Sequence, residues 1–253
     1  MSEHDRALAA AFDHRAAQFE RAPVQTDPDM LARLIQAADF PAGGLILDGG
    51  CGPGLVGEAL LKAGYRVFGV DLSEEMIARA RRRCAAFGER AVFERRSLFD
   101  PLSHGPFDGA ISRFVLHHTP DPAAFLRRQA ELLRPGGVLA ACDHTTDPDA
   151  HRADWHQRIE IGRDRTHTRN PTPGQMVDWL AAAGLTQVRL VEEPLTLDFD
   201  EWFDRGTPSQ EKAIVRQWML SRASARGFEP RLQQDGSVRI EGWLAIVRGV
   251  KPV

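Results

Sequence analysis

An acidic residue, three alternating glycines and a second acidic residue indicate a ligand-binding turn early in the chain. These residues are Asp48, Gly50, Gly52, Gly54 and Asp71. The glycines would let the chain turn sharply after a short buried strand and bring its backbone N–H groups close to a ligand. A carboxylate about 20 residues after such a turn can accept hydrogen bonds from ribose hydroxyls. The spacing therefore predicts a nucleoside cofactor at the end of that strand.

Histidines are the side chains best suited to proton transfer here, because imidazole titrates near neutral pH. Of the nine histidines, His117, His118, His144 and His167 lie where an α/β sheet places its ligand pocket. We select His144, after the fifth predicted strand, and His167, in the Arg-rich segment 163–169, as candidate catalytic groups. No H-E-x-x-H or comparable spacing joins the histidines, so no metal site is predicted.

Two other interpretations of the glycine turn have to be weighed. A tight turn between a strand and a helix uses glycine for steric reasons alone. A nicotinamide-dependent dehydrogenase also combines a glycine turn with a later acidic residue, but its fingerprint is G-x-G-x-x-G. Here the spacing is G-x-G-x-G, and Gly57 falls at the wrong offset for the last glycine of that fingerprint. The spacing therefore favours a nucleoside cofactor other than NAD.

Strand and helix patterns alternate around this turn. Apolar runs predict strands at residues 45–49, 66–70, 91–94, 107–111, 137–142, 186–191 and 238–248. Helical periodicity and capping residues predict helices at 7–19, 30–40, 55–63, from 73 onward, at 121–133 and 172–183, and, from a capping box at Thr207 and Gln210, up to about Arg226. This alternation predicts an α/β fold with a doubly wound, mostly parallel sheet of seven strands.

The remaining segments are predicted to be additions to one domain that spans residues 1–253. Two helices within residues 1–40 precede the first strand and would form an N-terminal helical cap over the binding crevice. Residues 143–171 and 194–237 follow the fifth and sixth strands and are longer than a minimal α/β sheet requires. Because both leave strands at their carboxyl ends, we expect them to build the substrate side of the site.

The glycine turn and several later segments resemble class I S-adenosylmethionine-dependent methyltransferases. The arrangement from Asp48 to Asp71 is similar to the first two motifs of that class. The segments 107–110, 115–118 and 133–137, with Asp143, resemble the landmarks of the UbiE/Coq5-like type 11 methyltransferases, and 163–169 and 202–208 resemble a YcgJ-like subgroup. The resemblance covers nearly the whole chain and implies a Rossmann-like class I fold with S-adenosyl-L-methionine as cofactor.

The resemblance also implies which residues surround the cofactor. They are Asp48, Gly50, Cys51, Gly52, Gly54, Asp71, Leu72, Ser97, Leu98, Phe99, Arg113 and Phe114. The first five would face the methionine end, Asp71 would hold both ribose hydroxyls, and 97–99 would contact the adenine edge. Ser97 stands where many relatives have Asp, so it would bind the adenine amine more weakly than a carboxylate. In such relatives, histidines at positions 117 and 118 often serve in packing.

The charge and the apolar content of the chain argue against nucleic acid and membrane partners. The formal net charge is −3, and the basic run 81–83 is expected to be a solvated helix face, so no nucleic acid partner is predicted. No stretch approaches the roughly 18 apolar residues that span a bilayer, and the three cysteines lack a C-x-x-C pair. We therefore expect a cytoplasmic protein with reduced thiols and no membrane partner, whose oligomeric state the sequence does not reveal.

The predicted function is methyl transfer from S-adenosyl-L-methionine to a small-molecule acceptor, at an oxygen, nitrogen or carbon atom. Two alternatives stay open. The bound sulfonium could serve a rearrangement without methyl transfer, or the chain could be a cofactor-binding module without turnover. The two long insertions, with their aromatic and ionisable residues, favour an enzyme over a binding module.

Overall fold

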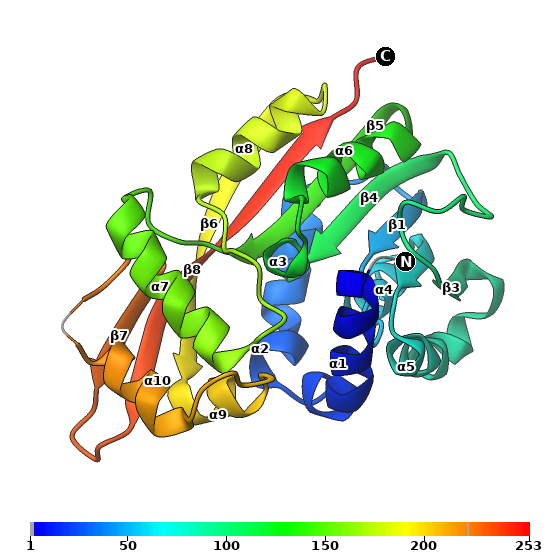
Figure 1. Cartoon of the computed structure of the whole chain (residues 1–253). Helices are drawn as coiled ribbons and strands as arrows, with labels where there is room; N and C mark the ends of the chain where they lie inside the picture. The colour runs from blue at the N-terminus through cyan, green and yellow to red at the C-terminus, as the bar shows by residue number, and fades with distance from the viewer. Residues whose placement is uncertain (1–2, 222) are drawn as a thin grey trace.

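The computed structural model describes residues 3–221 and 223–253, and it places helices on both faces of a mixed β-sheet (Figure 1). The strands are β1 (Leu45–Gly49), β2 (Arg66–Asp71), β3 (Ala91–Arg95), β4 (Phe107–Arg113), β5 (Leu133–His144), β6 (Thr186–Asp198), β7 (Phe228–Leu232) and β8 (Val238–Val250). The helices are α1 (Glu3–Phe19), α2 (Pro23–Thr26), α3 (Pro28–Ala38), α4 (Leu55–Lys62), α5 (Glu74–Cys84), α6 (Pro122–Leu132), α7 (Ala150–Arg163), α8 (Pro173–Ala182), α9 (Phe199–Asp204) and α10 (Lys212–Met219), with 3-10 turns η1 (Ala85–Arg90) and η2 (Leu116–His118).

The sheet has the strand order β3-β2-β1-β4-β5-β8-β6. The first five strands are parallel to one another, and β8 is antiparallel to both β5 and β6. This confirms the predicted doubly wound, mostly parallel α/β sheet. The sheet has eight strands rather than seven, because β7 pairs with β8 outside the main order.

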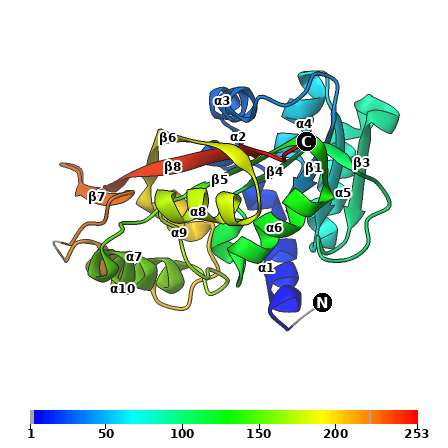
Figure 2. The same ribbon diagram turned by 90° about the horizontal axis from the view of Figure 1, so that it is seen from above.

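Successive strand residues pack against helices on opposite faces of the sheet, as the period of two in a strand requires. Ile46 belongs to the apolar cluster that contains Met30 and Leu34 of α3, whereas the next residue, Leu47, belongs to the cluster that contains Leu126 of α6. Figure 2 shows α3 and α4 on one side of the sheet and α6 and α8 on the other. Both faces are therefore covered, so the central strands can be apolar throughout.

Two predicted helix starts are confirmed at α6 and α8, where a side chain supplies the local cap. The predicted capping box is present at α8, where Thr172 and Gln175 bond reciprocally, and Asp121 caps α6. The helix predicted from Thr207 to about Arg226 is present only as α10, from residue 212 to residue 219, so its predicted cap and bounds are wrong. The N–H groups of Ser209 and Gln210 instead donate to the carbonyl of Gly162, at the end of α7, and α10 begins only at residue 212. A tertiary contact therefore replaces the local cap.

The sixth strand is longer than predicted. It continues to Asp198 although Pro194 cannot donate a ladder hydrogen bond. β6 lies at the edge of the sheet, where proline is tolerated, so residues 194–198 belong to the strand. The rest of the segment 194–237 forms α9, α10 and β7, and the segment 143–171 forms α7. Figure 1 shows these helices gathered at one end of the sheet.

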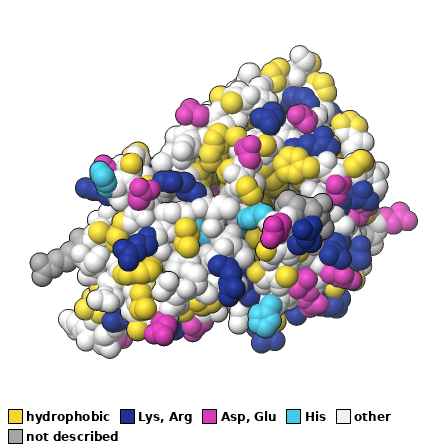
Figure 3. Space-filling model, viewed as in Figure 1, with side chains coloured by type: hydrophobic (Ala, Val, Ile, Leu, Met, Phe, Trp, Pro, Cys, Tyr) yellow, Lys and Arg dark blue, Asp and Glu magenta, His cyan; other side chains and the backbone are white. Residues whose placement is uncertain are grey.

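Charged side chains of both signs are interspersed on the face shown in Figure 3. The basic run predicted as a helix face lies at the end of α5, and two of its members form ion pairs. Arg83 bonds to Glu58 and Glu20, and Arg82 lies 3.7 Å from Glu75. Among the helices of the described residues, none combines the length and the apolar character that a bilayer-crossing segment needs.

Candidate active site

A cavity of about 350 Å³ lies at the carboxyl ends of β1, β2 and β4, with α1 along one side. Its size is that of a small-molecule site. It is lined by eleven of the predicted cofactor residues: Asp48, Gly50, Cys51, Gly52, Asp71, Leu72, Ser97, Leu98, Phe99, Arg113 and Phe114. The structure therefore brings together residues that are distributed over about a quarter of the chain.

Gly54 is the one predicted cofactor residue that does not line this cavity. It has φ +80° at the start of α4, and a Cβ there would lie 2.9 Å from the Cα of Ala80. A glycine is therefore required at position 54 because α4 and α5 approach each other closely there.

The turn itself is held by main-chain hydrogen bonds. The N–H groups of Gly50 and Cys51 both donate to the carbonyl of Val70, and Gly52 donates to the carboxylate of Asp71 at 2.8 Å. Gly50 has φ +74°, and a Cβ there would lie 2.6 Å from Val115. Both the backbone conformation and the available space thus require glycine at this position.

Asp71 is built into the turn as well as facing the cavity. One carboxylate oxygen accepts from Gly52 and the other from the N–H of Ser73, at 2.9 Å. Each oxygen keeps a further lone pair, so the carboxylate can accept two more donors. Burial raises the pKa of Asp71 above its ordinary value, and the hydrogen bonds from Ser73 and Gly52 oppose that shift.

Two oppositely charged side chains line this cavity, and each has one polar atom without a hydrogen-bond partner in the described residues. Within the described residues, Asp48 Oδ2 and Arg113 Nε have no hydrogen-bond partner, although their side chains are 1% and 7% exposed. The other nitrogens of Arg113 donate to the carbonyls of Val24 and Gln25, at 2.6 and 2.9 Å. Burial and the negative charge of Asp71 raise the pKa of Asp48 to about 7. A zwitterionic amino acid group fits these two atoms, because its ammonium and carboxylate lie on one carbon.

Comparisons with known proteins identify the family. The family described as "Methyltransferase domain" matches residues 20–190. The chain belongs to this family.

Named relatives agree with this assignment. A Xylella fastidiosa protein named ubiquinone biosynthesis O-methyltransferase is 39% identical over 171 residues, which are 65% of this chain and 68% of that protein. A Xanthomonas axonopodis protein with the same name is 28% identical over 84% of this chain and 90% of its own length. The YcgJ protein of Bacillus subtilis has the same fold, with a TM-score of 0.79 and 23% identity over 89% of this chain and 99% of that one. These findings confirm the predicted class I, S-adenosylmethionine-dependent methyltransferase.

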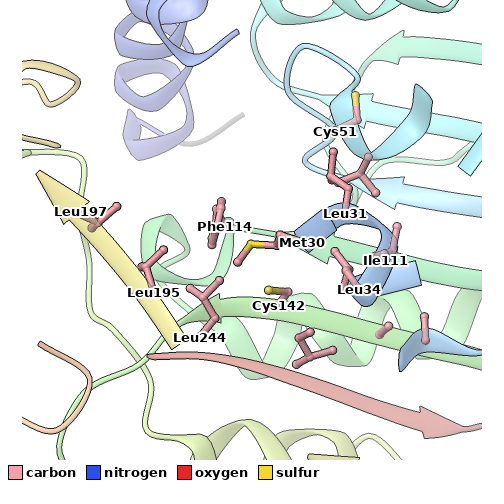
Figure 4. Packing of buried hydrophobic residues seen from close by; sticks show 14 of the residues in the cluster. Met30, Leu31, Leu34, Cys51, Ile111, Phe114, Cys142, Leu195, Leu197 and Leu244 are labelled. Carbon is pink, nitrogen blue, oxygen red and sulfur yellow. The ribbon is translucent and has the colours of Figure 1, made fainter. Parts of the chain in front are cut away.

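The end of the cavity beside α1 is mainly apolar and aromatic in this methyltransferase. Leu8, Phe12 and Phe19 of α1 line it, together with Phe114 and His118. Figure 4 shows Phe114 next to Met30 of α3, facing Leu195 and Leu244 of the outer strands. The α1 residues were not named as site residues from the sequence. The sequence predicted a helix at residues 7–19, within an N-terminal cap over the crevice, but not which of its side chains line the cavity.

His144 and His167, the predicted catalytic residues, do not line the large cavity. His144 is half-buried, stacks on Phe114 with ring centroids 4.7 Å apart, and borders a smaller, water-sized space beside His156 and Glu160. Burial and the charge of His117 lower the pKa of His144 to about 3. His144 therefore lies behind Phe114, outside the large cavity.

His167 is buried beneath α7. Its Nε2 lies 3.2 Å from Gln157 Oε1, and its Nδ1 has no partner within the described part of the chain. Burial lowers the pKa of His167 to about 3. In the same described part, no cluster of three or more His, Cys, Asp or Glu is arranged to hold a metal ion.

The pair His117 and His118 occupies two different environments. His117 Nδ1 lies 2.5 Å from Asp143, and although burial opposes it, the charge of Asp143 raises the pKa of His117. His118 lines the cavity, whereas His117 does not. Only the tertiary structure separates two residues that are adjacent in sequence.

Proposed function

We propose that this methyltransferase transfers the methyl group of S-adenosylmethionine to a small apolar acceptor bound beside α1. The observation that carries the proposal is that Asp48 Oδ2 and Arg113 Nε, both buried and without partners in the described residues, lie in the same cavity as the glycine turn and Asp71. The apolar end of that cavity supplies a separate place for an acceptor. The curated relatives named O-methyltransferases favour oxygen as the accepting atom.

The chain's own residues have separate tasks in this proposal. Asp48 binds the ammonium group of the cofactor, Arg113 its carboxylate, and Asp71 the ribose hydroxyls. Leu72 and residues 97–99 contact the adenine. When bound, the cofactor supplies an electrophilic methyl group on a sulfonium leaving group, so alignment and exclusion of water provide much of the rate. Helix α1 lines the acceptor end of the cavity, whereas neither insertion supplies a lining residue in the described part of the chain. The first insertion, 143–171, instead supports His118 through the carbonyl of Thr166.

Product analysis tests this function. The protein is incubated with S-adenosylmethionine and a set of phenols and catechols, and products are measured by mass spectrometry. Release of S-adenosylhomocysteine with an acceptor that is heavier by one methylene unit supports methyl transfer. An isomerised acceptor of unchanged mass would instead favour a rearrangement, and cofactor binding without turnover of any acceptor would favour a binding module.

Replacing Asp71 by alanine is expected to weaken S-adenosylhomocysteine binding by about 1.5–3 kcal/mol, because charge-assisted hydrogen bonds to ribose are lost. Isothermal titration calorimetry measures the change. Asp71→Asn is the matched control, since it keeps the shape and one acceptor oxygen and should lose less affinity. Equal affinity of Asp71→Ala and the unchanged protein would remove Asp71 from the site.

Cofactor affinity is expected to depend on pH through Asp48. Because the pKa of this carboxyl is raised to about 7, it is largely neutral at pH 6 and largely ionised at pH 8. Only the ionised form attracts an ammonium group, so S-adenosylhomocysteine should bind about tenfold more tightly at pH 8 than at pH 6. Calorimetry at the two pH values checks this. Asp48→Asn, which cannot ionise, should bind weakly with a flat pH profile, and a slope equal to that of the unchanged protein would contradict the assignment.

A further inference from the structure

Of the four histidines selected from the sequence, His118 is the one that lines the cavity, and His4 of α1 lines it as well. His118 lies in η2, directly after β4, is 5% exposed, and lines the cavity together with Phe12 and Thr119. Its ring meets the ring of Phe12 edge to face, with centroids 5.0 Å apart. A polar ring is thus placed at the aromatic end of the cavity, where an acceptor would bind under the proposed function.

The hydrogen bonds of His118 define which ring nitrogen carries the proton. Nδ1 lies 3.0 Å from the carbonyl oxygen of Thr166, which can only accept. The hydroxyl of Thr166 lies 3.3 Å from the same nitrogen and donates its own hydrogen to Asp164 Oδ1 at 2.7 Å, so it too can only accept from His118. Nδ1 must therefore carry the hydrogen.

A neutral imidazole with a proton on Nδ1 has its lone pair on Nε2. No group in residues 3–221 and 223–253 bonds to this nitrogen. Burial and the positive charge of His117 lower the pKa of His118 well below its ordinary value, so the ring is neutral at neutral pH. Among the described residues, His118 Nε2 is thus an unpaired hydrogen-bond acceptor in a mainly apolar part of the cavity.

Several elements hold the ring in this position. His4 Nε2 contacts the carbonyl of His118 at 2.9 Å, and Arg15 donates to the hydroxyl of Thr166 at 3.3 Å, so α1 contacts both His118 and its partner Thr166. From the sheet, Asp143 accepts from the N–H groups of Leu116 and His117 and so fixes η2. The position of Nε2 is therefore determined before an acceptor binds.

We propose that His118 is a catalytic residue that accepts the hydroxyl proton of an aromatic acceptor through Nε2. The inference rests on the proposed function and specifies its substrate class as phenols. The acceptor oxygen forms a bond to the methyl carbon as the carbon–sulfur bond breaks with its electron pair to sulfur, and the hydroxyl proton moves to Nε2. The charge that sulfur loses is then carried by the His118 imidazolium, which the carboxylate of Asp164 stabilises.

The matched variant for this proposal is His118→Asn. The asparagine amide can keep an N–H donor for the Thr166 carbonyl but has no atom in place of Nε2. The probes are phenol and anisole, which differ in the hydroxyl hydrogen, each titrated into protein saturated with S-adenosylhomocysteine. We expect phenol to bind the unchanged protein about tenfold more tightly than anisole, and the two to bind His118→Asn equally.

Nitrogen NMR provides a readout that does not depend on turnover. In the unchanged protein, the His118 signals should show a protonated Nδ1 and an unprotonated Nε2, and phenol should shift the Nε2 signal while anisole does not. With an acceptor from the product screen, His118→Asn should lower kcat by about 10²–10⁴-fold and leave cofactor affinity within twofold.

The outcomes separate this proposal from the proposed function. A proton on Nε2 in the free protein, an equal preference for phenol and anisole, or full kcat in His118→Asn overturns the role of His118, even if methyl transfer itself is observed. Failure of the unchanged protein to bind S-adenosylhomocysteine overturns the proposed function instead. Thermal melting of His118→Asn, expected within a few degrees of the unchanged protein, shows that the variant is folded.

Discussion

Replacing Asp143 by alanine is expected to lower the free energy of unfolding by about 3–5 kcal/mol, which would be a large loss of stability for a single change. The carboxylate is fully buried and accepts four hydrogen bonds. They come from the N–H groups of Leu116 (2.7 Å), His117 (3.3 Å) and His144 (2.7 Å), and from His117 Nδ1 at 2.5 Å. Alanine would leave these buried donors without an acceptor and would remove the carboxylate whose charge raises the pKa of His117.

Urea unfolding followed by circular dichroism measures this loss. Asp143→Asn keeps an acceptor oxygen but removes the charge, so it should fall between the alanine variant and the unchanged protein. Asp149→Ala is a second control, because it removes only the N-cap of α7 and should cost about 1 kcal/mol. A loss below 1 kcal/mol for Asp143→Ala would show that His117 and η2 do not depend on this carboxylate.

Replacing Arg15 by methionine is expected to cost about 3 kcal/mol and to release α1 from the rest of the molecule. Arg15 is 2% exposed and forms an ion pair with Asp164 at 2.5 Å. It also donates to the carbonyl of Arg205 at 3.1 Å. Methionine keeps most of the apolar stem but leaves Asp164 with only the more distant Arg163, at 3.8 Å. Removing one partner of a buried pair is costly because the other charge stays in the interior.

Hydrogen exchange measured by mass spectrometry gives the local readout, with faster exchange expected over residues 3–19. The control is a double-mutant cycle with Asp164→Asn, which keeps an oxygen that can accept from the Thr166 N–H. If the ion pair matters, the double variant should lose less stability than the sum of the two single changes. Additive losses, with unchanged exchange in α1, would contradict a coupling between these residues.

The cofactor half of the molecule was predictable because its determinants are local in sequence. The run 45–49 forms β1 with the predicted bounds, and the glycines after it adopt positive φ in the turn. β1, the glycine turn and Asp71 lie within about 25 residues of one another, so their spacing in the sequence largely determines their arrangement in space. The exception is Gly54, where the sequence cannot distinguish a ligand contact from a close approach between helices.

The acceptor half was predicted less well because long-range contacts determine it. Asp164 has arginines beside it in the sequence, yet it pairs at shorter distance with Arg15, 149 residues away, than with Arg163. His144 follows a predicted strand end and His167 lies in the Arg-rich segment, but neither lines the cavity. His144 stacks on Phe114, and His167 lies 3.2 Å from Gln157 of α7. The sequence could not favour His118 over the other histidines, because the carbonyl and hydroxyl of Thr166 come to lie beside its ring only in the folded chain. Such information exists only once the insertions are packed.

The position of α1 in the chain has an evolutionary consequence. The region shared with the methyltransferase family starts at residue 20, whereas α1, which lines the apolar end of the cavity, ends at Phe19. The matched region thus contains the glycine turn and Asp71, whereas a short segment before it supplies part of the apolar end of the cavity. Under the proposed function, exchanging this segment between paralogues is a compact route to new substrate preferences, provided that a basic residue is retained opposite Asp164.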